Sequence, residues 1–196
     1  MGKEKYLKDI ETLFKKSPVV SYNSITKIIR NKKPQNQYSK QLIRNLILKG
    51  KVRKLTKGYY TSHNDPSLSV FCFKPAYLGL QDALSFHNLW EQETIPIIVT
   101  SARVRPGIRR VLGYNVLLRR IDKRYFFGFD YYKENELYMP YSDIEKTLID
   151  IIHFKEKLSV ELIKEIEKKI NKRRFKSYLN RYPKIFRRRV LNMIRA

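Results

Sequence analysis

The sequence predicts a mixed α/β protein (α+β) with two domains and a helical, basic C-terminal tail, and three observations predict it. Between Ser17 and Ser62, two short helical patterns precede two β-prone runs that a Lys-Gly turn joins. Between residues 67 and 154, β-prone and helical runs are interspersed. Lys and Arg gather at the ends: 16 against 3 Asp and Glu in residues 1–62, 11 against 11 in 63–154, and 15 against 4 in 155–196.

The first domain, residues 1–62, begins with patterns for two helices. Apolar residues at i, i+3, i+4 and i+7 spacing predict an amphipathic helix over 3–16, which Pro18 stops. Val19 and Val20 are expected in a short strand beside a later hairpin. A second helix is expected near 23–30, capped by Ser21 or Asn23, and a turn follows at 31–34.

The next helical pattern runs from Asn36 to Lys49. Its apolar positions recur at three- and four-residue spacing and predict one buried face, formed by Leu42, Ile43, Leu46 and Ile47. Gly50 is suited to the left-handed backbone that ends many helices. Val52 and Leu55 then alternate with cations, and Lys57-Gly58 turns into the β-prone run 59–61. This order is typical of a winged helix-turn-helix.

Polar and cationic side chains mark the surfaces by which such a domain would bind DNA. Gln and Arg match base edges in the major groove, and Lys suits phosphate. We therefore expect the helix to present Gln37, Tyr38, Lys40, Gln41 and Arg44. The hairpin, or wing, would hold phosphates with Lys51, Arg53, Lys54 and Lys57, supported by Tyr59. The alternative is a small basic helical domain without a nucleic-acid role.

The second domain is expected at 67–154, after turn residues 63–66. We expect a strand at 67–73, a helix at about 78–89 and a strand at 95–100. A basic loop would follow at 103–110, then strands at 115–121, 124–129 and 136–140. Ser142 and Glu145 form a capping box that would open a helix to Ile152.

The tail, residues 155–196, reads as three helices packed on the second domain. They are expected at 159–170, 171–180 and 184–194, the first capped by Ser159. The tail and the basic loop carry further candidate phosphate contacts: Arg103, Arg105, Arg109, Arg110, Arg173, Arg174, Arg187, Arg188 and Arg189. The loop arginines would contact DNA or an acidic toxin surface, and simple solvation is at least as good an interpretation of them. The cation excess of the tail favours phosphate contact over ordinary exposed helix faces.

The sequence shows no catalytic or metal-binding pattern. Cys72 is the sole cysteine, and the three histidines have no metal-ligand spacing, so neither a metal nor a cofactor is expected. His87 lies near a helix end and is interpreted as a hydrogen-bonded structural residue. A metal-dependent nuclease would need converging carboxylates. Asp143, Glu145 and Asp150 are instead interpreted as first-turn acids, a cap and a surface partner. We expect no enzyme.

Apolar segments give no sign of a membrane protein. No run approaches the roughly 18–20 apolar residues that span a bilayer, and the N-terminal residues lack the apolar segment of a secretory signal. A cytoplasmic, nucleoid-associated protein is therefore expected.

Several segments of the second domain resemble the AbiEi family. They are Ala-Tyr-Leu-Gly-Leu-Gln-Asp-Ala-Leu-Ser-Phe-His-Asn-Leu-Trp-Glu-Gln at 76–92, Ile-Ile-Val-Thr at 97–100, Phe-Gly at 127–128, and Tyr-Ser-Asp-Ile-Glu-Lys-Thr-Leu-Ile-Asp at 141–150. In that family, a segment like Ser-Ala-Leu-Ser-His-Gly-Leu precedes a strand, and a Glu-Lys-Thr-Leu-Leu-Asp helix follows the β-region. The resemblance covers about residues 15–155. Asn88 stands where the family usually has Gly, and the tail lies beyond the match.

The resemblance implies an autorepressing antitoxin of a type IV toxin–antitoxin pair. The N-terminal domain would bind the promoter of its own operon, as a homodimer on an inverted repeat or as two copies on separate repeats. The second domain would oppose a nucleotidyltransferase-like toxin encoded nearby. Two alternatives stay open: an architectural protein that coats DNA or RNA without sequence preference, and a nuclease dependent on Asp143 or Glu145.

Overall fold

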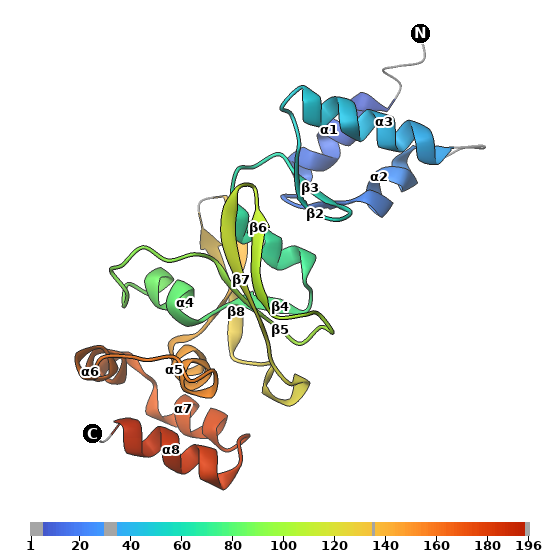
Figure 1. Cartoon of the computed structure of the whole chain (residues 1–196). Helices are drawn as coiled ribbons and strands as arrows, with labels where there is room; N and C mark the ends of the chain where they lie inside the picture. Colours follow the sequence, from blue (N-terminus) through green and yellow to red (C-terminus); the bar gives the residue numbers. More distant parts are fainter. Residues whose placement is uncertain (1–5, 30–34, 135, 195–196) are drawn as a thin grey trace. The chain divides into compact units, whose positions relative to one another are not determined.

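Two compact units make up the part of the chain that the computed structural model describes, residues 6–29, 35–134 and 136–194 (Figure 1). One is the described part of Met1–Cys72 together with Arg110–Tyr114, and the other is Phe73–Arg109 with the described part of Asn115–Ala196. The mixed α/β class is as the sequence predicted. The boundary differs, because residues 63–66 lie within the first unit and the division falls after Cys72.

In its described residues, the first unit has three α-helices, one 3-10 helix and a small antiparallel sheet. The helices are α1 (Leu7–Lys16), α2 (Tyr22–Ile28) and α3 (Gln35–Leu48). The strands β1 (Val20–Ser21), β2 (Arg53–Thr56) and β3 (Tyr59–Thr61) pair in the order β1-β3-β2, which confirms the expected strand beside the hairpin. The apolar faces of the helices meet in one core, made of Ile10, Phe14, Val20, Ile25, Ile29, Leu42, Ile43, Leu46 and Val52.

Local polar groups set the ends of these helices as expected. The Ser21 hydroxyl accepts a hydrogen bond from the Ser24 amide at 3.0 Å and caps α2. Gly50 follows α3 with φ +69°, a left-handed backbone that costs glycine little because it has no Cβ. The expected turn at 31–34 and residues 3–5 of the first expected helix lie outside the described residues.

A six-stranded mixed sheet in the order β6-β7-β5-β4-β9-β8 lies mostly in the second unit. Its strands are β4 (Ala76–Leu78), β5 (Ile97–Thr100), β6 (Gly107–Val111), β7 (Tyr114–Arg120), β8 (Phe129–Glu134) and β9 (Leu137–Ser142). Strand β4 runs antiparallel to β5 and parallel to β9, and β5 runs parallel to β7. The central strands β4 and β5 are buried throughout, as expected for strands covered on both faces.

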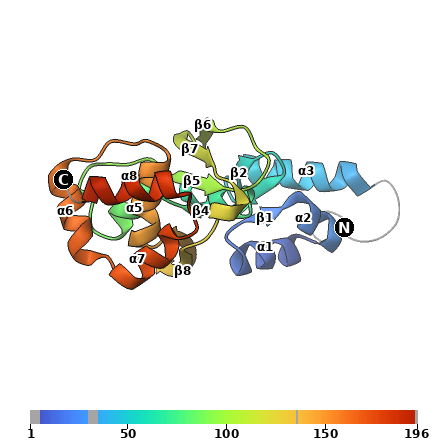
Figure 2. The same cartoon turned by 90° about the horizontal axis from the view of Figure 1, so that it is seen from below.

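Helix α5 (Ile144–His153) is the hub of the helical part of this unit. It contacts α4 (Leu80–Phe86), α6 (Val160–Lys169) and α7 (Lys172–Leu179), and α6 contacts α8 (Lys184–Ile194). These helices lie together in both views (Figure 2). Residues 145–152 of α5 are all buried, which matches a helix that is covered on all sides. Among the described residues, no helix is long and apolar enough to cross a membrane.

The expected strand at 67–73 is wrong, because Pro66–Cys72 is a 3-10 helix, η1. Asp65 and Ser69 explain this outcome. The Asp65 carboxylate accepts from the Ser67 amide at 2.8 Å, and the Ser69 hydroxyl donates to the Pro66 carbonyl at 2.7 Å. Such local bonds offer the backbone an alternative to a sheet ladder.

Three further expectations are corrected in the second unit. Part of the expected basic loop 103–110 is strand β6. This strand lies at the edge of the sheet and its residues alternate in exposure, so it accommodates arginine side chains. The expected strand at 124–129 is a second 3-10 helix, η2 (Lys123–Tyr125), followed by a bend, and β8 begins at Phe129. Asp143, and not Ser142, caps α5, because β9 extends through Ser142.

Candidate nucleic-acid interface

One face of α3 is apolar and buried, and the other is polar and exposed. Leu42, Ile43 and Leu46 lie in the core of the first unit. The exposed face carries the four side chains chosen from the sequence, Gln37, Lys40, Gln41 and Arg44, and with Tyr38 they line one shallow hollow. The structure therefore brings these four predicted base- and phosphate-contacting residues together on one helix face.

Two details of α3 differ from the expectation. Ile47, expected in the core, is 39% exposed, and Leu48 beside it is 75% exposed. Tyr38 is half-buried, its hydroxyl is buried, and its ring meets the edge of Tyr6 with centroids 6.2 Å apart. Tyr38 thus packs at the margin of the core and supports the helix, whereas its neighbours on the polar face point to solvent.

The β2–β3 hairpin presents three of its predicted cations to solvent. Arg53, Lys54 and Lys57 are exposed, while Val52 and Leu55 are buried, as the alternating pattern predicted. The Gly58 carbonyl accepts a hydrogen bond from the Tyr22 amide at 2.7 Å and ties the turn to α2. The hairpin is therefore held against the helices.

Tyr59 and Tyr60 form the inner strand of this hairpin. Tyr60 pairs with both Val20 and Lys54 across the small sheet. Burial raises the pKa of its hydroxyl above the usual value of 10.0. Tyr59 is half-buried, as a supporting side chain would be.

Lys51, predicted to contact phosphate, is engaged within the protein. Its ammonium forms an ion pair with the Glu11 carboxylate of α1 at 2.6 Å, across 40 residues of sequence. A hydrogen bond from Lys51 lowers the pKa of Glu11 below its usual value. Lys51 therefore links the start of the hairpin to α1 and is less available to phosphate than Arg53 or Lys54.

The four arginines at 103–110 behave in two ways. The Arg109 guanidinium donates to the Arg105 carbonyl at 2.7 Å and to the Ile108 carbonyl at 3.2 Å, so it folds back on its own segment. Arg103, Arg105 and Arg110 are exposed. These three remain available to an anionic partner.

Among the predicted tail arginines, Arg174 is the one that pairs with acids in the described part of the chain. Its guanidinium lies 3.8 Å from an Asp143 oxygen and 3.6 Å from a Glu145 oxygen, so it serves the packing of α7 against α5. Arg187 donates to the Asn180 side chain at 3.1 Å. The others are exposed on α7 and α8: Arg173, Arg188 and Arg189.

The acids that a nuclease would need have structural partners. Asp143 accepts from the Lys146 amide at 2.7 Å and from the Tyr178 hydroxyl at 2.8 Å, and burial raises its pKa above 3.8. Glu145 is buried and accepts from the Asn171 amide at 2.6 Å, where α7 begins. Among the described residues, no group of three or more His, Cys, Asp or Glu is arranged to hold a metal ion.

The interpretation of Asp150 as a surface partner is wrong. It is fully buried and pairs with the equally buried Lys146, one turn away on α5. The Tyr77 hydroxyl donates to its other oxygen at 2.6 Å, and Lys146 also donates to the Tyr182 hydroxyl at 3.2 Å. The i, i+4 spacing of opposite charges was the available signal for the pair, but not for its burial.

His87 has the structural role expected from the sequence. Its Nε2 lies 2.8 Å from the Ser142 carbonyl oxygen, and its ring packs against Phe86 and Tyr132.

Comparison with known proteins gives information on the fold alone. No family model matches this chain, and no curated protein matches it significantly. Among solved structures, the crystal structure of the RV2827C protein from Mycobacterium tuberculosis is similar, with a TM-score of 0.62 at 14% sequence identity. The match covers 97% of this chain and 76% of that one. At this identity, the likeness concerns the arrangement of the backbone.

Proposed function

We propose that this protein binds duplex DNA sequence-specifically through α3 and regulates transcription. The observation that carries the proposal is the exposed face of α3, where Gln37, Lys40, Gln41 and Arg44 point away from a buried apolar face. An α-helix fits the major groove, and bidentate Gln and Arg contacts distinguish base pairs there. The protein acts by binding, in the cytoplasm at the nucleoid.

The β2–β3 hairpin supports the same proposal as a wing. Its three exposed cations, Arg53, Lys54 and Lys57, would neutralise phosphates beside the groove that α3 reads. Three such contacts contribute about −2.7 to the slope of log K against log salt concentration, because each releases about 0.9 counterion. Binding should therefore weaken steeply with salt.

The deciding experiment measures binding of the full chain to its own upstream DNA and to a scrambled duplex of equal length, at two salt concentrations. Arg44→Ala removes one bidentate contact, worth about 1–3 kcal/mol, so affinity for the cognate duplex should fall about 5- to 150-fold. Lys8→Ala is the matched control, since it removes an exposed charge from α1. It should leave sequence preference unchanged.

The competing function is an architectural protein that grips DNA or RNA electrostatically. It would bind both duplexes alike, and Arg44→Ala would act no more strongly than Lys8→Ala. That result would overturn the regulatory proposal.

The resemblance to the AbiEi family supports an extension of the proposal, in which the regulator is an autorepressing antitoxin. Its partner would be a nucleotidyltransferase-like toxin, and its operator would contain repeats bound by a dimer or by two copies. Co-expression with a nucleotidyltransferase-like protein encoded beside it tests this role. Growth should be arrested by that protein alone and restored by the pair; arrest in both cases would exclude the antitoxin role.

A further inference from the structure

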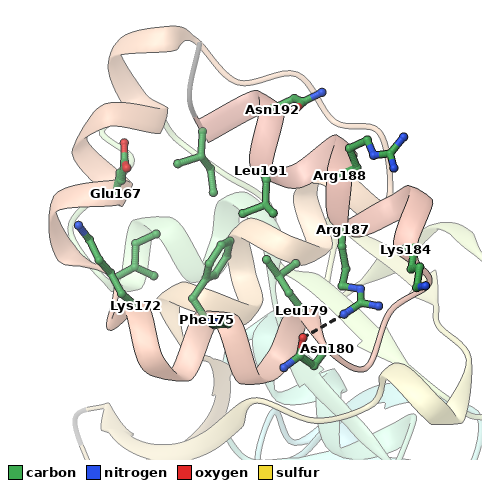
Figure 3. A pocket seen from close by; sticks show the side chains of 13 residues that line it. Glu167, Lys172, Phe175, Leu179, Asn180, Lys184, Arg187, Arg188, Leu191 and Asn192 are labelled. Atoms are coloured by element: carbon green, nitrogen blue, oxygen red, sulfur yellow. Dashed lines mark hydrogen bonds between the residues drawn. The ribbon is translucent and has the colours of Figure 1, made fainter.

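A groove with an apolar floor lies among α6, α7 and α8 (Figure 3). Its volume is about 720 Å³. Phe175 and Leu179 of α7 form the floor and are buried, and Leu191 of α8 faces them and is 42% exposed. Ile170 and Ile194 extend the apolar surface. The groove therefore offers unfilled apolar contacts along the helices of the tail.

The rim of this groove is cationic. It carries five positive side chains and one acid, Glu167; the five are Lys172, Lys176, Lys184, Arg187 and Arg188. Among the described residues, none of the five pairs with a carboxylate, and Arg187 donates only to the neutral Asn180 side chain. Like charges that line one groove repel one another, and an anionic partner would relieve that repulsion.

We propose that this groove binds an acidic amphipathic helix of a partner protein. A helix lays its apolar side chains at i, i+3, i+4 and i+7 into such a groove. Aspartate and glutamate flanking that stripe would meet the five rim cations. Helix α8, with 11 residues, is about 16 Å long and matches about three turns of a bound helix.

Nucleic acid fits the groove less well. Single strands bind by stacking bases on exposed aromatic rings. Phe175, the one aromatic side chain among the described lining residues, is only 7% exposed. Duplex phosphates would satisfy the rim and leave the apolar floor uncovered. A second copy of this chain, with a net charge of +24, lacks the acidity that would complement the cationic rim.

The test uses the full chain and a fluorescein-labelled synthetic helix of about 14 residues, with leucines at i, i+3, i+4 and i+7 and glutamates elsewhere. Fluorescence anisotropy should show binding in the micromolar range. Replacing its leucines by serine, or its glutamates by glutamine, should each weaken binding about tenfold or more. Equal binding of all three peptides, or of none, would overturn the proposal.

Two pairs of variants place the peptide in the groove. Leu191→Asp should weaken binding about tenfold, whereas Ile185→Asp, on the same helix but outside the groove and 80% exposed, should change it less than about twofold. Lys176→Glu should likewise weaken binding more than Arg189→Glu, because Arg189 is exposed outside the lining. Equal effects within both pairs would overturn the proposal.

Measuring DNA binding by the same variants separates this proposal from the proposed regulatory function. Leu191→Asp should bind the upstream duplex as the wild type does, and Arg44→Ala should bind the peptide as the wild type does. If a random duplex of about 20 base pairs displaces the peptide, and Lys176→Glu weakens duplex binding more than peptide binding, the groove is a nucleic-acid site and the proposal fails.

Discussion

The buried ion pair of α5 is the feature whose removal should cost this protein most. The Lys146 and Asp150 side chains are both 0% exposed and pair one turn apart. The Lys146 ammonium lies 5.0 Å from the centre of the Phe127 ring, and the Tyr77 hydroxyl donates to Asp150 at 2.6 Å. Burial lowers the pKa of Lys146, which shows the cost of holding its charge away from water.

Asp150→Asn removes the anion and leaves this ammonium buried without its counter-charge. Breaking a buried pair from one side costs about 3–5 kcal/mol. With a urea dependence of about 2 kcal/mol per molar, the unfolding midpoint should fall by about 2 M. Lys146→Met should cost a similar amount, because it strands the carboxylate. The double variant should lose about 1–3 kcal/mol less than the sum of the two single losses.

Trp90 makes the measurement specific to the second unit. It is the sole tryptophan of the chain and packs against the core that α5 shares with α7 and α8. Its fluorescence during urea unfolding therefore reports this unit. Glu165→Gln, an exposed change on α6, is the control and should stay within about 0.5 kcal/mol of the wild type. A loss below about 1 kcal/mol for Asp150→Asn, or additive single losses, would refute the reasoning.

Three further predictions follow from particular side chains. Burial lowers the pKa of His153 below 6.5, so between that lowered value and 6.5 the unfolded chain binds a proton that the folded chain does not. The free energy of unfolding should therefore fall as the pH drops through this window. Urea titrations at several pH values should show a smaller fall for His153→Phe than for the wild type. Gly128→Ala should destabilise the second unit far more than Gly58→Ala destabilises the first, and thermal unfolding measures both losses. Both glycines have positive φ, but only a Cβ at residue 128 would meet a neighbouring atom, the Lys146 Cβ at 2.8 Å. Lys54→Ala should reduce the salt slope of DNA binding by about 0.9, and Lys51→Ala should reduce it less, because Lys51 is already paired with Glu11; equal reductions would place both on phosphates.

Local patterning predicted the elements whose signal lies within a few turns of chain. The apolar spacing of 36–49 and Gly50 placed α3 within one residue at each end, and the expected bounds of α8 match the structure. Ser21 and Ser159 cap helices as expected, because a cap is a contact between residues three apart. The strand expected at 67–73 is wrong because of similarly local contacts, since the Asp65 and Ser69 side chains hydrogen-bond to the backbone of Ser67 and Pro66.

The polar face of α3 and the cation-rich ends of the chain follow from the order of residues alone, since helical periodicity fixes which side chains share a face. The order of residues alone does not determine three other features: the burial of Lys146 and Asp150, the pairing of Lys51 with Glu11, and the groove beneath Leu191. Each depends on which distant segment covers a given face. The Lys51–Glu11 pair joins residues 40 apart in the sequence. Tyr77 and Tyr182, from opposite ends of the second unit's sequence, form hydrogen bonds with Asp150 and Lys146 respectively. Only tertiary packing decides whether a charge meets water, a counter-charge or an apolar wall, because burial is a property of the neighbours that the fold assembles.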